Sequence, residues 1–270
     1  MKSIFTLLLA IAINFCYAAQ VDTVSVFSNS MQKNIKASVV TPNGYDKTKK
    51  YPVIYLLHGY SGNHTGWLVE SVAQNLVDEY NIIIVCPDGG FSSWYFDSPI
   101  DKSSQYETYF TKELIPWIDK NYNTVTDKNG RGITGLSMGG HGALYLSFRH
   151  QDLFGTAGSM SGGVDIRPFP DNWDISKRLG SYKDNQQLWE ENTVVNMLHL
   201  LTPNSLALII DCGTADFFYQ VNCKLHEKML YMNIAHDFIS RPGAHDWNYW
   251  KNAVKYQMLF MTEFFKRNIN

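Results

Sequence analysis

Residues 133–146, ITGLSMGGHGALYL, place a serine among glycines, with an apolar run before it and an Ala/Leu-rich run after it. Two local structures are compatible with this stretch. One is a surface loop, and the other is a tight turn that joins a buried strand to a helix and holds one hydroxyl exposed. The rest of the chain decides between them.

Strand-like and helix-like segments alternate along the sequence. Continuous apolar runs, each ending in Gly, Pro or Asp, predict buried strands within residues 51–59, 81–90, 130–135, 154–163, 205–213 and 233–243. Helical segments are predicted over residues 70–80, 104–122, 139–150, 218–232 and 247–266. Residues 21–27 and 36–41 predict an antiparallel pair ahead of them. This order predicts an α/β fold, with a mostly parallel central sheet and helices on both faces.

One segment breaks the alternation. Residues 164–202 are polar and aromatic, with short helical pieces between two core strands. We interpret them as a small cap over a ligand site at the carboxyl ends of the strands, where open sheets of this kind bind ligands. The alternative is a surface excursion. Apart from the first 18 residues, the length of the chain predicts a single domain over residues 19–270.

The N-terminal residues have the pattern of a secretory leader. Lys2 precedes a short apolar run, and small residues end at Ala18. The run is too short to span a bilayer, so we expect cleavage near Ala19 and a secreted or periplasmic protein without stable membrane insertion. The alternatives are a buried N-terminal helix and a lipid anchor on Cys16, for which Asn14 and Phe15 are unfavourable neighbours.

Charge and cysteine content argue against several classes of function. The formal net charge is −2, which does not favour nucleic acid or an anionic membrane as a partner. The four cysteines include Cys16 and no C-x-x-C pair, which argues against a zinc or redox site. Cys86, Cys212 and Cys223 remain; Cys86 and Cys212 read as buried core residues, and a disulfide involving Cys212 or Cys223 stays open. The sequence indicates no particular oligomeric state.

The serine of the opening stretch fits a nucleophile pattern. Residues 135–139 read G-x-S-x-G, preceded by a strand-like run and followed by a helix-like run. A turn this tight strains the backbone at Ser137, and side chains in place of the flanking glycines would clash with the neighbouring strand and helix. The helix N-terminus also favours developing negative charge. The pattern therefore predicts Ser137 as a nucleophile.

A serine needs a base and an acid, which this fold places later in the chain in the order acid, then base. Of the eight histidines, His245 alone follows the last strand, in a Pro-Gly loop, so we predict it as the base. Asp216, on a loop beyond a strand, is the preferred acid. Asp211, at the end of that strand, is the alternative, and we expect it to bind backbone groups of the turn instead. We expect Asp246 to point away from the site.

The loop after the first central strand, HGYSG over residues 58–62, supplies one donor for the oxyanion. We predict the backbone amides of Tyr60 and Met138 as the two oxyanion donors. The alternative for His58 and Gly59 is a simple turn.

Together, YLLHGYSG, PDGGFSSWY, GLSMGGHGAL, DCGTADFF and PGAHDWNYW resemble the esterase D family of α/β-hydrolases, over nearly the whole chain after the leader. That family includes feruloyl and acetyl xylan esterases, S-formylglutathione hydrolases, tributyrin esterases and the antigen 85 mycolyltransferases. The resemblance implies Ser137, Asp216 and His245 as the triad, the Tyr60 and Met138 amides as oxyanion donors, and no metal or organic cofactor. The leader favours the secreted feruloyl and acetyl xylan esterase branch.

Aromatic residues near the strand ends are candidates for substrate contact. Trp94 and Tyr95 have the right position to stack on a sugar or phenolic ring; the alternative is packing under the cap. Trp173 and Trp189 in the cap are weaker candidates.

Three hypotheses for the function follow. The first is a secreted serine carboxylesterase that hydrolyses small acyl or phenolic esters, including esters linked to plant polysaccharides. The second is an acyltransferase that uses the same triad. The third is a non-catalytic binding protein on this fold, which the intact serine, aspartate and histidine in the right order disfavour.

Overall fold

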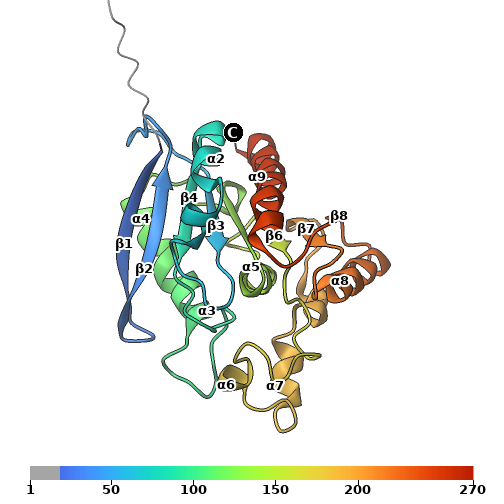
Figure 1. Cartoon of the computed structure of the whole chain (residues 1–270). Coiled ribbons are helices and arrows are strands. Elements are labelled where there is room, and N and C mark those ends of the chain that lie inside the picture. Colours follow the sequence, from blue (N-terminus) through green and yellow to red (C-terminus); the bar gives the residue numbers. More distant parts are fainter. Residues whose placement is uncertain (1–18, 270) are drawn as a thin grey trace, which may run out of the picture.

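A computed structural model describes residues 19–269, and the predicted leader lies outside them. One eight-stranded sheet crosses the molecule in the order β1-β2-β4-β3-β5-β6-β7-β8 (Figure 1). β1 and β2 pair antiparallel, β2 joins β4 antiparallel, and every later pairing is parallel. The strands are β1 Gln20–Ser28, β2 Lys33–Thr41, β3 Val53–Leu57, β4 Ile83–Pro87, β5 Arg131–Gly135, β6 Thr156–Met160, β7 Ala207–Gly213 and β8 Asp237–Arg241.

Helices cover both faces of the sheet, as the alternation of apolar runs predicts. Along β3, Val53, Tyr55 and Leu57 face one core and Ile54 and Leu56 face the other. α2 and α9 pack on the second face, and the helices between Tyr106 and Asn121, with α5 and α8, pack on the first. The helices are α1 Gly66–Glu70, α2 Ala73–Tyr80, α3 Tyr106–Thr108, α4 Ile115–Asn121, α5 Met138–Arg149, α6 Ser176–Leu179, α7 Gln186–Glu191, α8 Tyr219–Tyr231 and α9 Trp247–Asn268.

Two helical segments differ from the sequence prediction. Residues 70–80 were expected as one helix, but the chain turns to extended backbone at Ser71, so that α1 and α2 are separate. The segment predicted over 104–122 begins at Tyr106 and passes through a π-helical turn, Tyr109–Leu114, into α4. Pro116, which has no amide hydrogen to donate, lies just after this turn.

Residues 164–202 lie between β6 and β7 and extend beyond the strand ends, where α6 and α7 lie together (Figure 1). They also hold the 3-10 turns Val194–Asn196 and Leu198–Leu200; a further such turn, Lys128–Gly130, precedes β5. The indole of Trp94 donates to the Trp173 carbonyl at 3.1 Å, and the Ser98 hydroxyl donates to the Arg178 carbonyl at 2.7 Å. These bonds tie the insertion to the loop that follows β4.

The described residues show the state of three cysteines and the extent of the apolar helices. Cys86, Cys212 and Cys223 are free thiols in residues 19–269, and burial raises the pKa of Cys86 to about 12. Within the same residues, we find no helix with the length and hydrophobicity needed to cross a bilayer.

Glu107 anchors the start of the helical segment to α5. Its carboxylate accepts hydrogen bonds from Tyr145 at 2.6 Å, Arg149 at 2.9 Å and His150 at 2.8 Å. Burial alone would raise the pKa of Glu107, but these bonds outweigh it and lower the pKa to about 2. The carboxylate therefore stabilises the fold when it is ionised.

We expect Glu107→Gln to lower the free energy of unfolding at neutral pH by about 3 kcal/mol. Because the pKa lies below its ordinary value of 4.5, the wild-type advantage is complete above that pH and disappears as the pH falls toward 2. Denaturant titrations of both proteins between pH 7 and pH 3 measure this, with the exposed Glu227→Gln as control. A stability difference that does not change over this range would contradict the prediction.

Candidate active site

Ser137 lies in a sharp turn between β5 and α5, as the opening stretch predicts. Its φ is 56° and its ψ is −118°, a conformation that residues with a side chain rarely adopt. The turn is fixed by its neighbours: the Ser137 amide donates to the Met160 carbonyl at 2.9 Å, and the Ser137 carbonyl accepts from the His141 amide at 3.0 Å. The hydroxyl is thereby held at the carboxyl edge of the sheet.

The glycines around Ser137 are required by close backbone contacts. A Cβ on Gly135 would lie 2.6 Å from the carbonyl oxygen of Gly139, and one on Gly139 would lie 2.5 Å from the carbonyl oxygen of Leu57. A Cβ on Gly140 would lie 2.6 Å from the Ser159 hydroxyl. The helix can therefore approach β3 and β6 this closely only where these side chains are absent.

We expect Gly139→Ala to lower kcat at least about 100-fold, since its Cβ would push on the backbone oxygens of Leu57 and His58 and displace the turn. Gly66→Ala is the matched control, because its Cβ would have only an ordinary contact, 3.8 Å from Trp247. Catalytic rates and melting temperatures of the two variants test this. Full activity of Gly139→Ala in a folded protein would show that the close contact is not needed.

The structure brings Ser137, His245 and Asp216 into one hydrogen-bonded chain. The Nε2 atom of His245 is 2.9 Å from the Ser137 Oγ, and its Nδ1 atom is 2.8 Å and 3.0 Å from the two carboxylate oxygens of Asp216. The Asp216 side chain is fully buried, and His245 is 15% exposed. An ionised carboxylate only accepts, so Nδ1 carries the hydrogen and Nε2 is free to accept the serine proton.

Two loops hold the acid beside the base. After β7, the Thr214 amide donates to the Arg241 carbonyl and the Ala215 amide donates to the Gly243 carbonyl, both at 2.9 Å. The Asp216 carboxylate also accepts from the Phe218 amide at 2.8 Å. These bonds join the ends of two adjacent parallel strands, which is why residues far apart in sequence meet here.

Asp211 and Asp246 have other contacts. The Asp211 carboxylate is buried and binds the Arg241 guanidinium and the Tyr249 hydroxyl, not the backbone of the turn as expected from the sequence. Burial raises the pKa of Asp211, although the bonds from Tyr249 and Arg241 oppose this. Asp246 begins α9, where its carboxylate accepts from the Tyr249 amide at 3.0 Å, and thus points away from His245 as predicted.

Of the two predicted oxyanion donors, Met138 follows Ser137 in the chain, and Tyr60 lines the cleft that Ser137 also lines. In residues 19–269, neither the Tyr60 amide nor the Met138 amide donates to a protein acceptor. His58 positions the loop that carries Tyr60: its Nδ1 is 2.7 Å from the Gly59 carbonyl, and its Nε2 is 2.7 Å from the Gly89 amide that donates to it. His58 therefore joins two loops and is not a second base.

A cleft of about 640 Å³ includes Ser137 and His245 in its wall. Tyr60 and Val69 line it on the side of the loop after β3, and Trp173, Phe217 and Trp247 contribute aromatic surface. The centroid of the Phe217 ring is 4.1 Å from the centroid of the His245 ring and 5.5 Å from that of the Trp173 ring. Phe217 and Trp247 were not among the predicted substrate contacts, although they lie beside the predicted acid and base in DFF and HDW.

The prediction that Trp94 and Tyr95 contact substrate is not supported by their positions. Both side chains are 1% exposed and neither lines the cleft. Trp94 packs against His141, and the Tyr95 hydroxyl donates to the His58 carbonyl at 3.1 Å. Trp94 follows the alternative interpretation and packs beneath the insertion, whereas Tyr95 packs against His58 and Gly142. Trp189 is also fully buried.

His141 belongs to the same buried layer. Its nitrogens lie 3.1 Å from the Trp94 carbonyl and 2.9 Å from the Asn192 carbonyl, so it links α5 to the insertion. Burial lowers the pKa of His141 to about 4, although the contacts with the Asn192 and Trp94 carbonyls oppose this.

Comparison with known proteins adds independent information. A family model described as "Putative esterase" matches residues 28–261. An endo-1,4-beta-xylanase/feruloyl esterase of Xylanibacter ruminicola is 38% identical over 158 residues, which cover 53% of this chain and 22% of that protein. An acetyl esterase of Caldicellulosiruptor saccharolyticus is 24% identical over 259 residues, covering 86% of this chain and 94% of that one.

Among solved structures, a ferulic acid esterase is 30% identical, with a TM-score of 0.81, over 92% of this chain and 99% of that one. The chain thus spans about a fifth of the length of the Xylanibacter protein and nearly the full length of the other two relatives.

Proposed function

We propose that this chain, which belongs to the esterase family and has an α/β-hydrolase fold, is a carboxylic-ester hydrolase that acts through Ser137, His245 and Asp216. The observation that carries this proposal is the hydrogen-bonded chain from the Ser137 hydroxyl through the His245 ring to the Asp216 carboxylate.

In this mechanism, His245 Nε2 takes the proton as the Ser137 Oγ attacks the ester carbonyl carbon. The C–O bond to the alcohol then breaks, and His245 returns the proton to the leaving alkoxide. Water attacks the acyl-enzyme with His245 again as base, which releases the acid and restores the serine. Asp216 holds the ring in the Nδ1–H tautomer and stabilises its charged form.

The carbonyl oxygen becomes negative in both tetrahedral intermediates. The amides of Tyr60 and Met138 are the proposed donors to it, and their lack of any protein acceptor within the described residues supports this role. Loss of one such donor usually costs about 3 kcal/mol of transition-state stabilisation. Both donors are backbone groups, so their positions depend on the conformations of the loop after β3 and of the turn at Ser137. We therefore expect these two conformations to determine the rate.

We propose acetyl and feruloyl-type esters, including those on plant polysaccharides, as the substrate class, and a secreted or periplasmic location. The aromatic wall of Trp173, Phe217 and Trp247 supports a phenolic acyl group, because such surfaces stack on planar rings. The names of the feruloyl esterase and acetyl esterase relatives support the same class. The sequence pattern of residues 1–18 supports secretion.

We expect the purified protein to hydrolyse both p-nitrophenyl acetate and methyl ferulate, releasing one acid for each alcohol. Initial rates with both esters, and product analysis by chromatography, measure this. Addition of a sugar acceptor distinguishes acyl transfer, since a transferase would form a new sugar ester at the expense of free acid. The proposed hydrolysis would be overturned if the protein hydrolysed neither ester, or if most of the acyl group were transferred to the sugar and not released as free acid.

A further inference from the structure

A second, smaller hollow of about 170 Å³ lies beside the loop that follows β4. We call it the Lys33 hollow; its lining includes Lys33, Phe91, Ser92, Ser104, Tyr106 and Arg178. These residues come from β2, from the loop between β4 and α3, from the start of α3 and from α6. Three distant parts of the chain, around Lys33, residues 90–106 and Arg178, thus converge on it.

The hollow is a neighbour of the cleft. Tyr60 lines the cleft, Phe91 lines the hollow, and their rings lie edge to face with centroids 4.8 Å apart. The Ser61 amide also donates to the Phe91 carbonyl at 2.8 Å. The ring of Phe91 is 59% exposed. The Tyr60–Phe91 pair therefore joins a residue of the cleft wall to a residue of the wall of the hollow.

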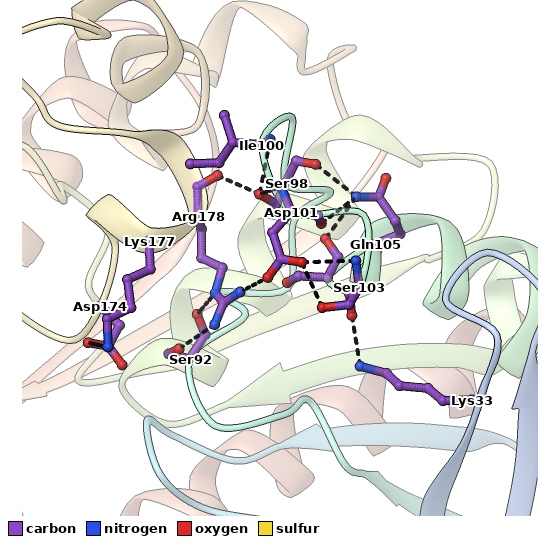
Figure 2. A network of polar contacts seen from close by, with 11 residues as sticks. Lys33, Ser92, Ser98, Ile100, Asp101, Ser103, Gln105, Asp174, Lys177 and Arg178 are labelled. Atoms are coloured by element: carbon purple, nitrogen blue, oxygen red, sulfur yellow. Dashed lines mark hydrogen bonds and ion pairs between the residues drawn. The ribbon is translucent and has the colours of Figure 1, made fainter.

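One wall of the hollow is a fixed polar frame. Figure 2 shows Arg178 and Lys33 approaching it from opposite sides. The guanidinium of Arg178 binds the Asp101 carboxylate and the Ser92 hydroxyl, and Asp101 also accepts from the Ser103 hydroxyl at 2.6 Å. The acceptors of Asp101 are thus already used by groups of the protein itself.

The unused groups of the hollow are hydrogen-bond donors. Ser104 is 4% exposed, and its hydroxyl has no partner among the described residues, which is costly for a buried polar group unless a ligand or water binds it. Lys33 donates to the Ser103 carbonyl at 2.8 Å and has two further hydrogens. The Tyr106 hydroxyl donates to no acceptor among residues 19–269. It lies close to the backbone of Gly90, where an added Cβ would be 2.4 Å from the hydroxyl oxygen.

The charges of the lining favour an anion. Lys33 and Arg178 are positive and Asp101 is negative, which leaves one positive charge. Asp88 also acts on Lys33 but does not line the hollow. Burial lowers the pKa of Lys33, with Asp101 opposing this and Arg178 adding to it. The ammonium contacts the Ser103 carbonyl and the Tyr106 ring but no carboxylate within hydrogen-bond distance among the described residues, so a bound carboxylate would supply an anionic partner.

We propose that the Lys33 hollow is a subsite for an acidic sugar, with the carboxylate bound by Lys33 and by the hydroxyls of Ser104 and Tyr106. The exposed ring of Phe91 offers the apolar contact that the face of a sugar ring needs. The inference rests on the proposed function, and it specifies the substrate as an ester on a carbohydrate that contains a uronic acid residue.

The test is a calorimetric titration of the full protein with D-glucuronate and, separately, with D-glucose. We expect glucuronate to bind at least tenfold more tightly than glucose, and Lys33→Met to weaken glucuronate about tenfold. Lys36→Met, which removes the same charge from an exposed position of β2, should bind like wild type. The inference would be overturned if the wild-type protein bound the two sugars with equal affinity, if Lys33→Met bound glucuronate as tightly as wild type, or if glucuronate did not bind at all.

Ser104→Ala provides a second test that does not depend on charge. Removal of an unpartnered buried hydroxyl should leave the melting temperature unchanged or higher, while the affinity for glucuronate falls. An unchanged affinity would contradict the proposed role. Binding is measured without turnover, so the two proposals can fail separately. A protein that hydrolyses p-nitrophenyl acetate but does not bind glucuronate refutes this inference alone. A protein that binds glucuronate but hydrolyses neither ester refutes the proposed hydrolysis and leaves the hollow as a binding site for an acidic sugar.

Discussion

Replacement of Ser137 by alanine is expected to lower kcat/KM for p-nitrophenyl acetate by about four to six orders of magnitude. The hydroxyl is the atom proposed to form the acyl-enzyme, and its Oγ lies 2.9 Å from the only ring nitrogen of His245 that faces it. Without it, only the oxyanion donors and binding remain to accelerate attack by water. Initial rates of the two purified proteins measure the loss.

Ser159→Ala is the matched control for this substitution. Ser159 is a fully buried serine on the neighbouring strand β6, and its hydroxyl has no hydrogen-bond partner among the described residues. We expect this variant to fold and to retain its activity. If Ser137→Ala kept more than about a hundredth of the wild-type rate, another residue would have to be the nucleophile.

Asp216→Asn is expected to lower kcat by about 10⁴-fold with little change in stability. The amide that replaces the carboxylate can donate to Nδ1, which then favours the tautomer with hydrogen on Nε2. In that tautomer, the ring presents a hydrogen to the Ser137 Oγ and cannot accept its proton. Stopped-flow or steady-state rates at pH 7 to 8 measure the effect.

Asp211→Asn separates the two carboxylates that the sequence left as alternatives. It breaks a buried ion pair with Arg241, so we expect the free energy of unfolding to fall by about 3–5 kcal/mol, while kcat of the folded protein stays within about tenfold of wild type. The reverse pattern, with Asp211→Asn inactive and Asp216→Asn active, would assign the role of the acid to Asp211.

The turn at Ser137, between β5 and α5, is the part of the molecule that the sequence predicts best. Gly135 and Gly139 leave space only for backbone, and that requirement is visible as G-x-S-x-G between an apolar run and a helix-like run. The position of Asp216 and His245 after successive strand-like runs likewise predicts that they meet, because the carboxyl ends of parallel strands share one edge of the sheet.

The walls of the cleft are not predictable in this way. Trp94 and Tyr95 follow a strand-like run and were predicted to contact substrate, but both are buried: the Trp94 indole is bonded to the insertion, and the Tyr95 hydroxyl is bonded to the His58 carbonyl. Phe217 and Trp247 line the cleft because the two loops of the acid and the base turn toward each other. The partner of Asp211 depends on the length of Arg241 and on the start of α9, and no local pattern encodes that contact.

The most direct test of the account is to identify the residue that becomes covalently modified. The protein is incubated with a p-nitrophenyl phosphonate ester, which traps an activated serine, and is then analysed by intact mass and by peptide mapping. We predict one adduct per chain, on Ser137, with loss of esterase activity in proportion to labelling. An adduct on a different residue that tracks the loss of activity, or full activity with Ser137 modified, would contradict the central claim.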